Sequence, residues 1–66
     1  MSAGVEIERR HSNGGTRSFL VWLISPTGHR MLFHEADAYA EALEFALEAA
    51  PVFGPVLRDD GAEPIQ

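Results

Sequence analysis

Six consecutive apolar residues, Phe19 to Ile24 in the stretch SFLVWLIS, constrain the fold of this chain more than any other feature. Side chains of a strand alternate between its two faces. The run therefore places three apolar residues on each face, which are Phe19, Val21 and Leu23 on the first and Leu20, Trp22 and Ile24 on the second. A strand that is apolar on both faces is typical of a sheet centre or of a strand covered on both sides.

Two further strand patterns flank this run. Residues 5–11 alternate between apolar and charged side chains, which indicates a half-buried strand. An Asn-Gly-Gly sequence within residues 12–17 predicts a hairpin that joins this strand to the apolar run. Pro26 and Gly28 predict a turn before a third strand at residues 29–34. We therefore expect a three-stranded antiparallel meander.

A helix is predicted over residues 35–50, because Ala, Leu and Glu dominate this segment and are strong helix formers. The acidic Glu35 and Asp37 suit a first helical turn, and Pro51 is expected to end the helix. Val56 and Leu57 are expected to add a short edge strand. The predicted fold class is α+β, with one domain at residues 1–58 and a flexible acidic tail at residues 59–66.

One helix can cover one face of such a sheet. The other face is then either an exposed interaction surface centred on Trp22, or it is covered by Phe53, Val56 and Leu57 folding back. A chain of 66 residues buries a marginal core, and without cysteine it has no disulfide to stabilise that core. Self-association or partner binding becomes the favoured way to gain stability.

The termini and hydropathy give no sign of a membrane or an export signal. Four charged residues lie within the first ten, and the longest apolar run is far too short to span a bilayer. The absence of cysteine agrees with a reducing compartment. We expect a cytoplasmic protein that does not contact a membrane.

Metal binding and catalysis both lack a supporting pattern. His34 and Glu35 resemble the start of a zinc-protease motif, but Ala38 stands where the second histidine ligand is needed. No nucleophile motif or phosphate loop is present, and a chain of this length has little room for a pocket. We expect no metal, no cofactor and no enzymatic activity.

The predicted helix carries a stripe of four carboxylates on one side. At 100° per residue these residues fall within about 60° of one another, and they are Asp37, Glu41, Glu44 and Glu48. Like charges four residues apart, and anions near a helix C-terminus, both destabilise a helix. No basic residue in the helix offsets them. Such local inconsistency is typical of a functional surface; the alternative is an ordinary solvated polar face, with Arg30 or Arg58 reaching across to neutralise part of it.

The rest of the helix divides into two predicted strips. The first is expected to pack on the sheet and comprises Ala36, Tyr39, Ala40, Leu43, Ala46, Leu47 and Ala50. The second lies between the first and the carboxylates and comprises Ala38, Ala42, Phe45 and Ala49. Its small residues would let another surface approach, with Phe45 as the anchor. The alternative interpretation is that both strips form one wide apolar arc.

Charge is distributed unevenly along the chain, whose formal net charge is −5. Residues 1–34 hold four arginines against two glutamates, and residues 35–66 hold one arginine against eight acidic residues. The stripe rises about 16 Å, or one charge per about 5 Å, whereas a DNA strand carries one per about 3.4 Å. Glu35 and the acidic tail would extend this footprint.

In length, net charge and acidic stripe the chain resembles the small acidic inhibitors encoded by bacteriophages and mobile elements, which include anti-CRISPR and antirestriction DNA mimics. This resemblance covers about a quarter of the chain. It implies a non-catalytic inhibitor whose partner is a protein with a basic nucleic-acid-binding surface. Phe45 and Trp22 would add apolar contacts to those of the carboxylates.

Two other functions stay open. Arg30 to Ala46, RMLFHEADAYAEALEFA, is similar to the strand-to-helix junction of integrase arm-binding domains and of the plant ethylene-response DNA-binding domain. That resemblance implies DNA reading by exposed sheet residues, here Arg9, Arg10, Arg17, Trp22 and Arg30. The net charge of −5 disfavours direct nucleic-acid binding. The remaining alternative is an accessory homodimer joined through Phe45 or Trp22.

Overall fold

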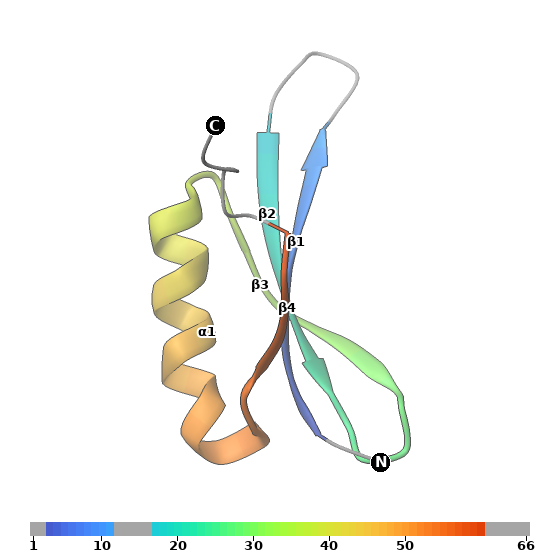
Figure 1. Ribbon diagram of the computed structural model, residues 1–66. Coiled ribbons are helices and arrows are strands. Elements are labelled where there is room, and N and C mark those ends of the chain that lie inside the picture. The colour runs from blue at the N-terminus through green and yellow to red at the C-terminus, as the bar shows by residue number, and fades with distance from the viewer. Residues whose placement is uncertain (1–2, 12–16, 61–66) are drawn as a thin grey trace.

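The protein has an α+β fold in which one helix lies against a four-stranded mixed sheet (Figure 1). The structure is a computed structural model that describes residues 3–11 and 17–60. The elements follow in the order β1 (Gly4–His11), β2 (Arg17–Ile24), β3 (Arg30–Ala36), α1 (Tyr39–Phe53) and β4 (Val56–Asp59). The predicted Asn-Gly-Gly hairpin lies outside the described residues, but the antiparallel pairing of the two strands on either side of it is present.

The sheet has the strand order β3-β2-β1-β4, so the apolar β2 lies inside it as its sequence predicts. β2 is antiparallel to both β1 and β3, which gives the expected meander. The sheet has four strands rather than three, because β4 joins the other side of β1 as a parallel edge strand, which confirms the short edge strand expected at Val56 and Leu57. The Val5 N–H donates to the Pro55 carbonyl (3.0 Å) and the Asp60 N–H donates to the Ile7 carbonyl (2.9 Å). Asp59 and Asp60, predicted as the start of the tail, thus lie along β1.

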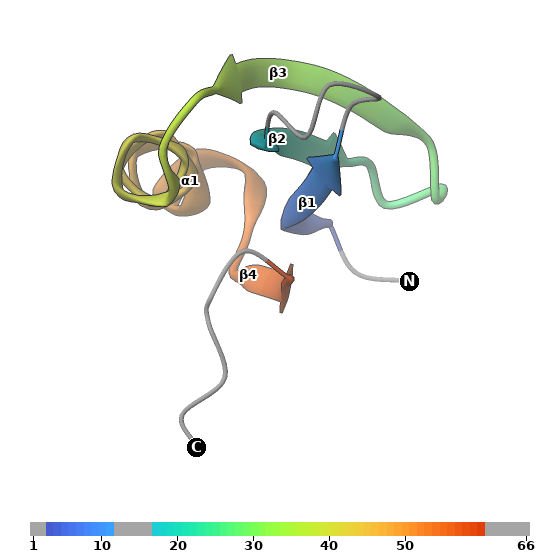
Figure 2. The ribbon, with the colours of Figure 1, turned by 90° about the horizontal axis from the view of Figure 1, so that it is seen from above.

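The helix covers the face of the sheet that carries Phe19, Val21 and Leu23. On that face Val5 lies opposite Leu23 and Ile7 lies opposite Val21 across the β1–β2 ladder. Figure 2 shows α1 on one side of a strongly twisted sheet, between the ends of β3 and β4. The buried core consists of Val5, Ile7, Phe19, Val21, Leu23, Ala36, Ala42, Ala46 and Ala49.

Both ends of the helix differ from the prediction. β3 continues to Ala36, which pairs with Phe19 and is 1% exposed, so the helix begins at Tyr39 rather than at residue 35. Pro51 lies inside the helix, which ends at Phe53. The fixed φ of proline is close to the helical value, so Pro51 can continue the helix, although it cannot donate a backbone hydrogen bond to the Leu47 carbonyl. The Gly54 N–H bonds to the Ala50 carbonyl (2.8 Å), and Gly54 has a φ of 126° that favours glycine.

The helix is also rotated relative to the prediction. Ala42, Ala46 and Ala49, two of which were assigned to an outer strip, are the residues that α1 buries against the sheet. Leu47, which was expected to pack, is 57% exposed. Apolar side chains surround most of this helix, so the pattern left its rotation open. Alanine lets the helix backbone approach the sheet closely, and this close approach decides which strip turns inward.

We expect Ala46→Leu to destabilise the protein by about 1–3 kcal/mol, because Ala46 is fully buried and a larger side chain would push α1 away from the sheet. Urea denaturation would measure the change in the free energy of unfolding. Ala40→Leu is the matched control, since Ala40 is exposed on the same helix. An equal effect of the two substitutions would contradict this packing.

Tyr39 joins the start of the helix to the last strand. Its ring packs edge-to-face against Phe19 (centroids 5.9 Å apart), and its hydroxyl donates to Asp59 Oδ2 (2.5 Å). The hydrogen bond to Asp59 first, then burial and the carboxylate charge, raise the pKa of Tyr39 from 10.0 to about 12. Tyr39 thus links α1, β2 and β4, and its neutral form is the one that folding favours.

Because the pKa is higher in the folded chain, the contribution of Tyr39 is fully present below pH 10 and is lost as the pH rises towards 12. We expect the free energy of unfolding to fall over this window, and Tyr39→Phe to remove that part of the pH dependence. Tyr39 is the single tyrosine, so its absorbance titration reports this pKa directly. A titration midpoint at pH 10 would contradict the bond to Asp59.

Candidate functional site

Two of the predicted carboxylates lie on the outer face of α1. Glu44 and Glu48 are exposed and one helical turn apart. Within the part of the chain that the structure describes, neither side chain has a hydrogen bond or ion pair. The two arginines that were considered as neutralising partners are engaged elsewhere, Arg30 with Glu6 (3.4 Å) and Arg58 with Asp60 (2.6 Å). The outer helix face therefore keeps its negative charge.

Glu41 differs from these two because it has a partner within the chain. The Nε2 atom of His34 lies 2.8 Å from Glu41 Oε2, and the His34 ring stacks on Phe45 with centroids 3.7 Å apart. The partner of Glu41 is thus His34, rather than either of the arginines that the sequence offers. Residues 34 and 41 lie on different elements, so helical spacing gave no signal of this pair.

The other predicted acidic residues are separated from the helix face. Asp37 is exposed but precedes α1, in the bend after β3. Glu35 lies within β3 opposite Leu20, on the face of the sheet that turns away from α1. The predicted continuous stripe is therefore reduced to Glu44 and Glu48, with Glu41 beside them and Asp37 before the first turn.

Phe45, the predicted anchor for a partner, packs within its own chain. Its ring meets that of Phe33 edge-to-face (centroids 6.1 Å apart) as well as stacking on His34. A bulge opposite Val21 and Trp22 allows the neighbouring Phe33 and His34 to reach the same side of β3. These contacts hold α1 against β3 and leave Phe45 half-buried.

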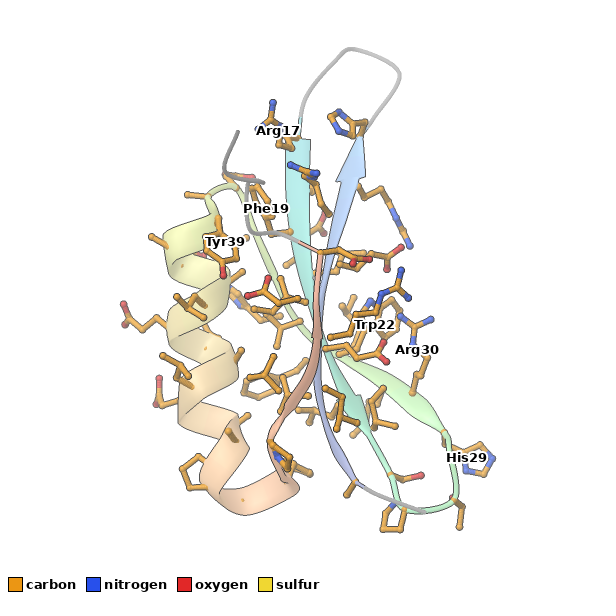
Figure 3. The ribbon with its side chains drawn as sticks, viewed as in Figure 1. Arg17, Phe19, Trp22, His29, Arg30 and Tyr39 are labelled. Atoms are coloured by element: carbon orange, nitrogen blue, oxygen red, sulfur yellow. The ribbon has the colours of Figure 1, made fainter. Side chains whose placement is uncertain are left out.

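The face of the sheet away from α1 carries a polar network around Trp22 (Figure 3). The indole N–H donates to Glu8 Oε1 (2.9 Å), and the Arg30 guanidinium lies 4.4 Å from the ring centroid. Arg30 also pairs with Glu6 at 3.4 Å. A cation over an aromatic face is attracted by the ring quadrupole. Trp22 is therefore partly covered by its own chain.

The face away from α1 is neither a fully exposed interaction surface nor fully covered by the C-terminal segment. Leu20 and Ile24 are 3% and 9% exposed, so the face is not bare. A Cβ atom added at Gly4 would collide with the side chain of Leu57, which therefore lies against this part of β1. Val56 instead packs on the core beside α1. The C-terminal segment is thus an edge strand of the sheet, which places Val56 on the helix face and Leu57 on the other face.

The arginines proposed for DNA reading do not share one face. Arg10 and Arg30 lie on the face of Trp22, whereas Arg9 and Arg17 alternate onto the other face, opposite Phe19 and His11. Glu8 lies 3.4 Å from the Arg10 guanidinium and 3.8 Å from that of Arg30. Carboxylates therefore offset the positive charge of this surface locally.

The described residues form no pocket and no group of three or more potential metal ligands. No helix among them is long and apolar enough to cross a membrane. Comparisons with protein-family models, with curated proteins and with solved structures find no match. Any function must therefore be argued from the surfaces of the chain itself.

Sequence reasoning missed one surface, which is the outer part of β3. Met31, Leu32 and Phe33 are 60%, 48% and 45% exposed. The sequence predicts a strand at residues 29–34, but its pattern does not indicate that these apolar side chains are exposed. Its exposure follows from the position of β3 at the edge of the sheet, which no local pattern specifies.

We expect Arg30→Ala to shift the fluorescence of Trp22 to longer wavelength, because the guanidinium shields the indole from water. The loss of this contact should also destabilise the protein by about 0.5–1 kcal/mol. Trp22 is the single tryptophan, so the emission reports this site alone. Arg10→Ala is the control, since Arg10 is an exposed neighbour without a contact to the ring. An unchanged emission in Arg30→Ala would refute the stacking.

Proposed function

We propose that this chain is a non-catalytic protein-binding inhibitor, which presents the outer face of α1 to a basic nucleic-acid-binding surface in place of DNA. Inhibition of the anti-CRISPR or antirestriction type fits this mode of binding. The observation that carries the proposal is the pair of exposed carboxylates, Glu44 and Glu48, on a helix that contains no basic residue in its last turn.

The geometry of the helix supports this mode of binding. Glu44 and Glu48 are separated by about 6 Å along the axis, a distance that spans fewer than two nucleotides of one DNA strand. Side chains on a packed helix are held at fixed spacing, so a basic groove can meet both charges at once. Glu41 has an exposed fraction of 53% for its side chain, and it extends the negative surface towards His34.

The local energetics of the helix support the same proposal. Glu44 and Glu48 repel each other at i,i+4, and no basic residue in the last turn of α1 offsets them. This repulsion costs a few tenths of a kcal/mol. A binding partner that neutralises both carboxylates would remove this cost.

DNA binding through the sheet is the weaker candidate. Arg30 and Arg10 share the surface around Trp22, which favours it, but Glu6 and Glu8 lie within ion-pair distance of these arginines. Phosphate binding would have to replace those carboxylates. A gel-shift with duplex DNA at low salt separates the two candidates, since the inhibitor proposal expects no shift.

The proposal can be tested with purified CRISPR effector complexes and restriction enzymes. We expect the protein to compete with DNA for one of these enzymes, with an affinity that falls steeply as salt increases. Glu44→Lys should weaken the competition by about tenfold, on the order of 1.4 kcal/mol. The same change replaces i,i+4 repulsion with attraction to Glu48, so the fold should be retained.

Thr27→Lys is the matched control, because Thr27 is exposed in the turn between β2 and β3 and lies outside the outer helix face. Circular dichroism would check that both variants fold. Equal competition by the wild type and Glu44→Lys would refute the role of the helix face. Failure to compete with DNA for any enzyme of the panel would refute the inhibitor proposal itself.

A further inference from the structure

β3 forms one edge of the sheet, with no strand beyond it in the part of the chain that the structure describes (Figure 2). The turn before β3 fixes the direction of its backbone groups, because the Ser25 N–H donates to the His29 carbonyl (2.9 Å). Residues of an antiparallel pair alternate between bonded and non-bonded positions. Because His29 is at a bonded position, the next residue, Arg30, is at a non-bonded one, and so is Leu32. Their N–H and C=O groups therefore point away from β2, towards the free edge.

The same edge is apolar in its middle. Met31, Leu32 and Phe33 are each about half exposed, in a strand of seven residues. Leu32 lies opposite Trp22 on the open face of the sheet, whereas Phe33 contacts Phe45 on the helix face. Apolar side chains thus lie on both sides of an unpaired backbone edge. Such an edge is a template for pairing with another strand.

We propose that β3 pairs with β3 of a second copy of this chain, antiparallel, about a twofold axis between Leu32 and Phe33. The two four-stranded sheets would then form one continuous sheet. A twofold axis uses the same surface of both copies, so it closes the assembly at a dimer. This surface is distinct from the outer helix face and from Trp22 or Phe45.

Charge complementarity selects the second copy as the occupant of this edge. In the proposed register Arg30 lies opposite Glu35 of the second copy, and Glu35 lies opposite its Arg30. Both residues are on the face of the sheet that turns away from α1, since Arg30 pairs with Ile24 and Glu35 with Leu20. Glu6 and Glu8 both contact one guanidinium nitrogen of Arg30, Nη2, so its remaining N–H groups would pair with Glu35 of the second copy. The twofold axis repeats this ion pair, which gives two.

In the same register, the next pair of residues towards the axis also has both side chains on one face of the sheet. Met31 would lie opposite His34 of the second copy, and both are on the helix side of the sheet. A slip of one residue would place Arg30 opposite Ala36 or His34 of the second copy, and would bring side chains of opposite faces together. The central pair, Leu32 and Phe33 of the second copy, lies on opposite faces, and the bulge at Phe33 accommodates this change of face next to the axis.

The charge of the chain does not oppose this contact. β3 contains one arginine and one glutamate, so the edge is balanced although the whole chain carries −5. Glu44 and Glu48 lie on the outer side of α1 rather than at the strand edge. A small core without disulfides gains stability from such an association.

Sedimentation equilibrium tests the dimer. We expect the wild type to dimerise with a dissociation constant tighter than about 1 mM. Leu32→Lys should make the protein monomeric, because it places a charge in the middle of the paired edge. Val52→Lys is the matched control, since Val52 is 78% exposed on α1, and it should leave the dimer intact. A wild type that stays monomeric at millimolar concentration, or forms larger assemblies, overturns the proposal.

Mixing two charge variants tests the register. Glu35→Arg alone sets arginine against arginine, and Arg30→Glu alone sets glutamate against glutamate, so each should be monomeric at concentrations where the wild type dimerises. An equimolar mixture restores both ion pairs and should form a heterodimer. Dimers of either variant alone that are as tight as the wild type, or no association on mixing, overturn the register.

Arg30 also contacts Trp22 and Glu6, so Arg30→Glu is checked by its Trp22 fluorescence and circular dichroism. If this variant does not fold, the comparison of Leu32→Lys with Val52→Lys decides the proposal. A dimer that survives Leu32→Lys would show that another surface joins the two copies.

Discussion

The close packing of the alanine face of α1 on the centre of the sheet is the contact on which the rest of the structure depends. Ala42 and Ala46 are fully buried against sheet residues that include Val5, Ile7 and Val21. Larger residues at these positions would hold the helix further away. This short separation allows Tyr39 to reach Asp59 in β4 and Phe45 to reach β3, so one helix ties both edges of the sheet together.

The same contact fixes what the surface presents. Once Ala42, Ala46 and Ala49 turn inward, Glu44 and Glu48 must turn outward, and Glu41 comes beside His34. The carboxylates that remain without a partner are therefore those furthest from the sheet. The proposed inhibitor surface is thus a consequence of how the helix packs.

The face of the sheet away from α1 and the edge strand β3 do not depend on the packing of the helix in the same way. Trp22 is half-buried because Arg30 lies on its ring, and Glu8 accepts the hydrogen bond from its indole N–H. Side chains of the sheet itself therefore cover Trp22 and bind its polar group. The edge of β3 has no such cover among the described residues, and its exposed apolar side chains alternate across both faces. The proposed dimer would use that edge and leave both outer helix faces available.

The sequence by itself determined the α+β class, the central position of the apolar strand and the existence of one helix. Alternation in residues 5–11, the double-sided apolar run and the Ala-, Leu- and Glu-rich segment are local patterns with a direct physical basis. The sequence also indicated a short edge strand at Val56 and Leu57. Tertiary structure alone decided that this strand pairs in parallel with β1, where the helix ends lie and how the helix is rotated. Ala36 joined β3 because its pairing with Phe19 outweighed helix propensity, and Pro51 stayed helical because the fixed φ of proline is close to the helical value. The pairing of Glu41 with His34 and the exposure of β3 were undetermined for the same reason, since both depend on which elements meet in space rather than on the residues of one segment.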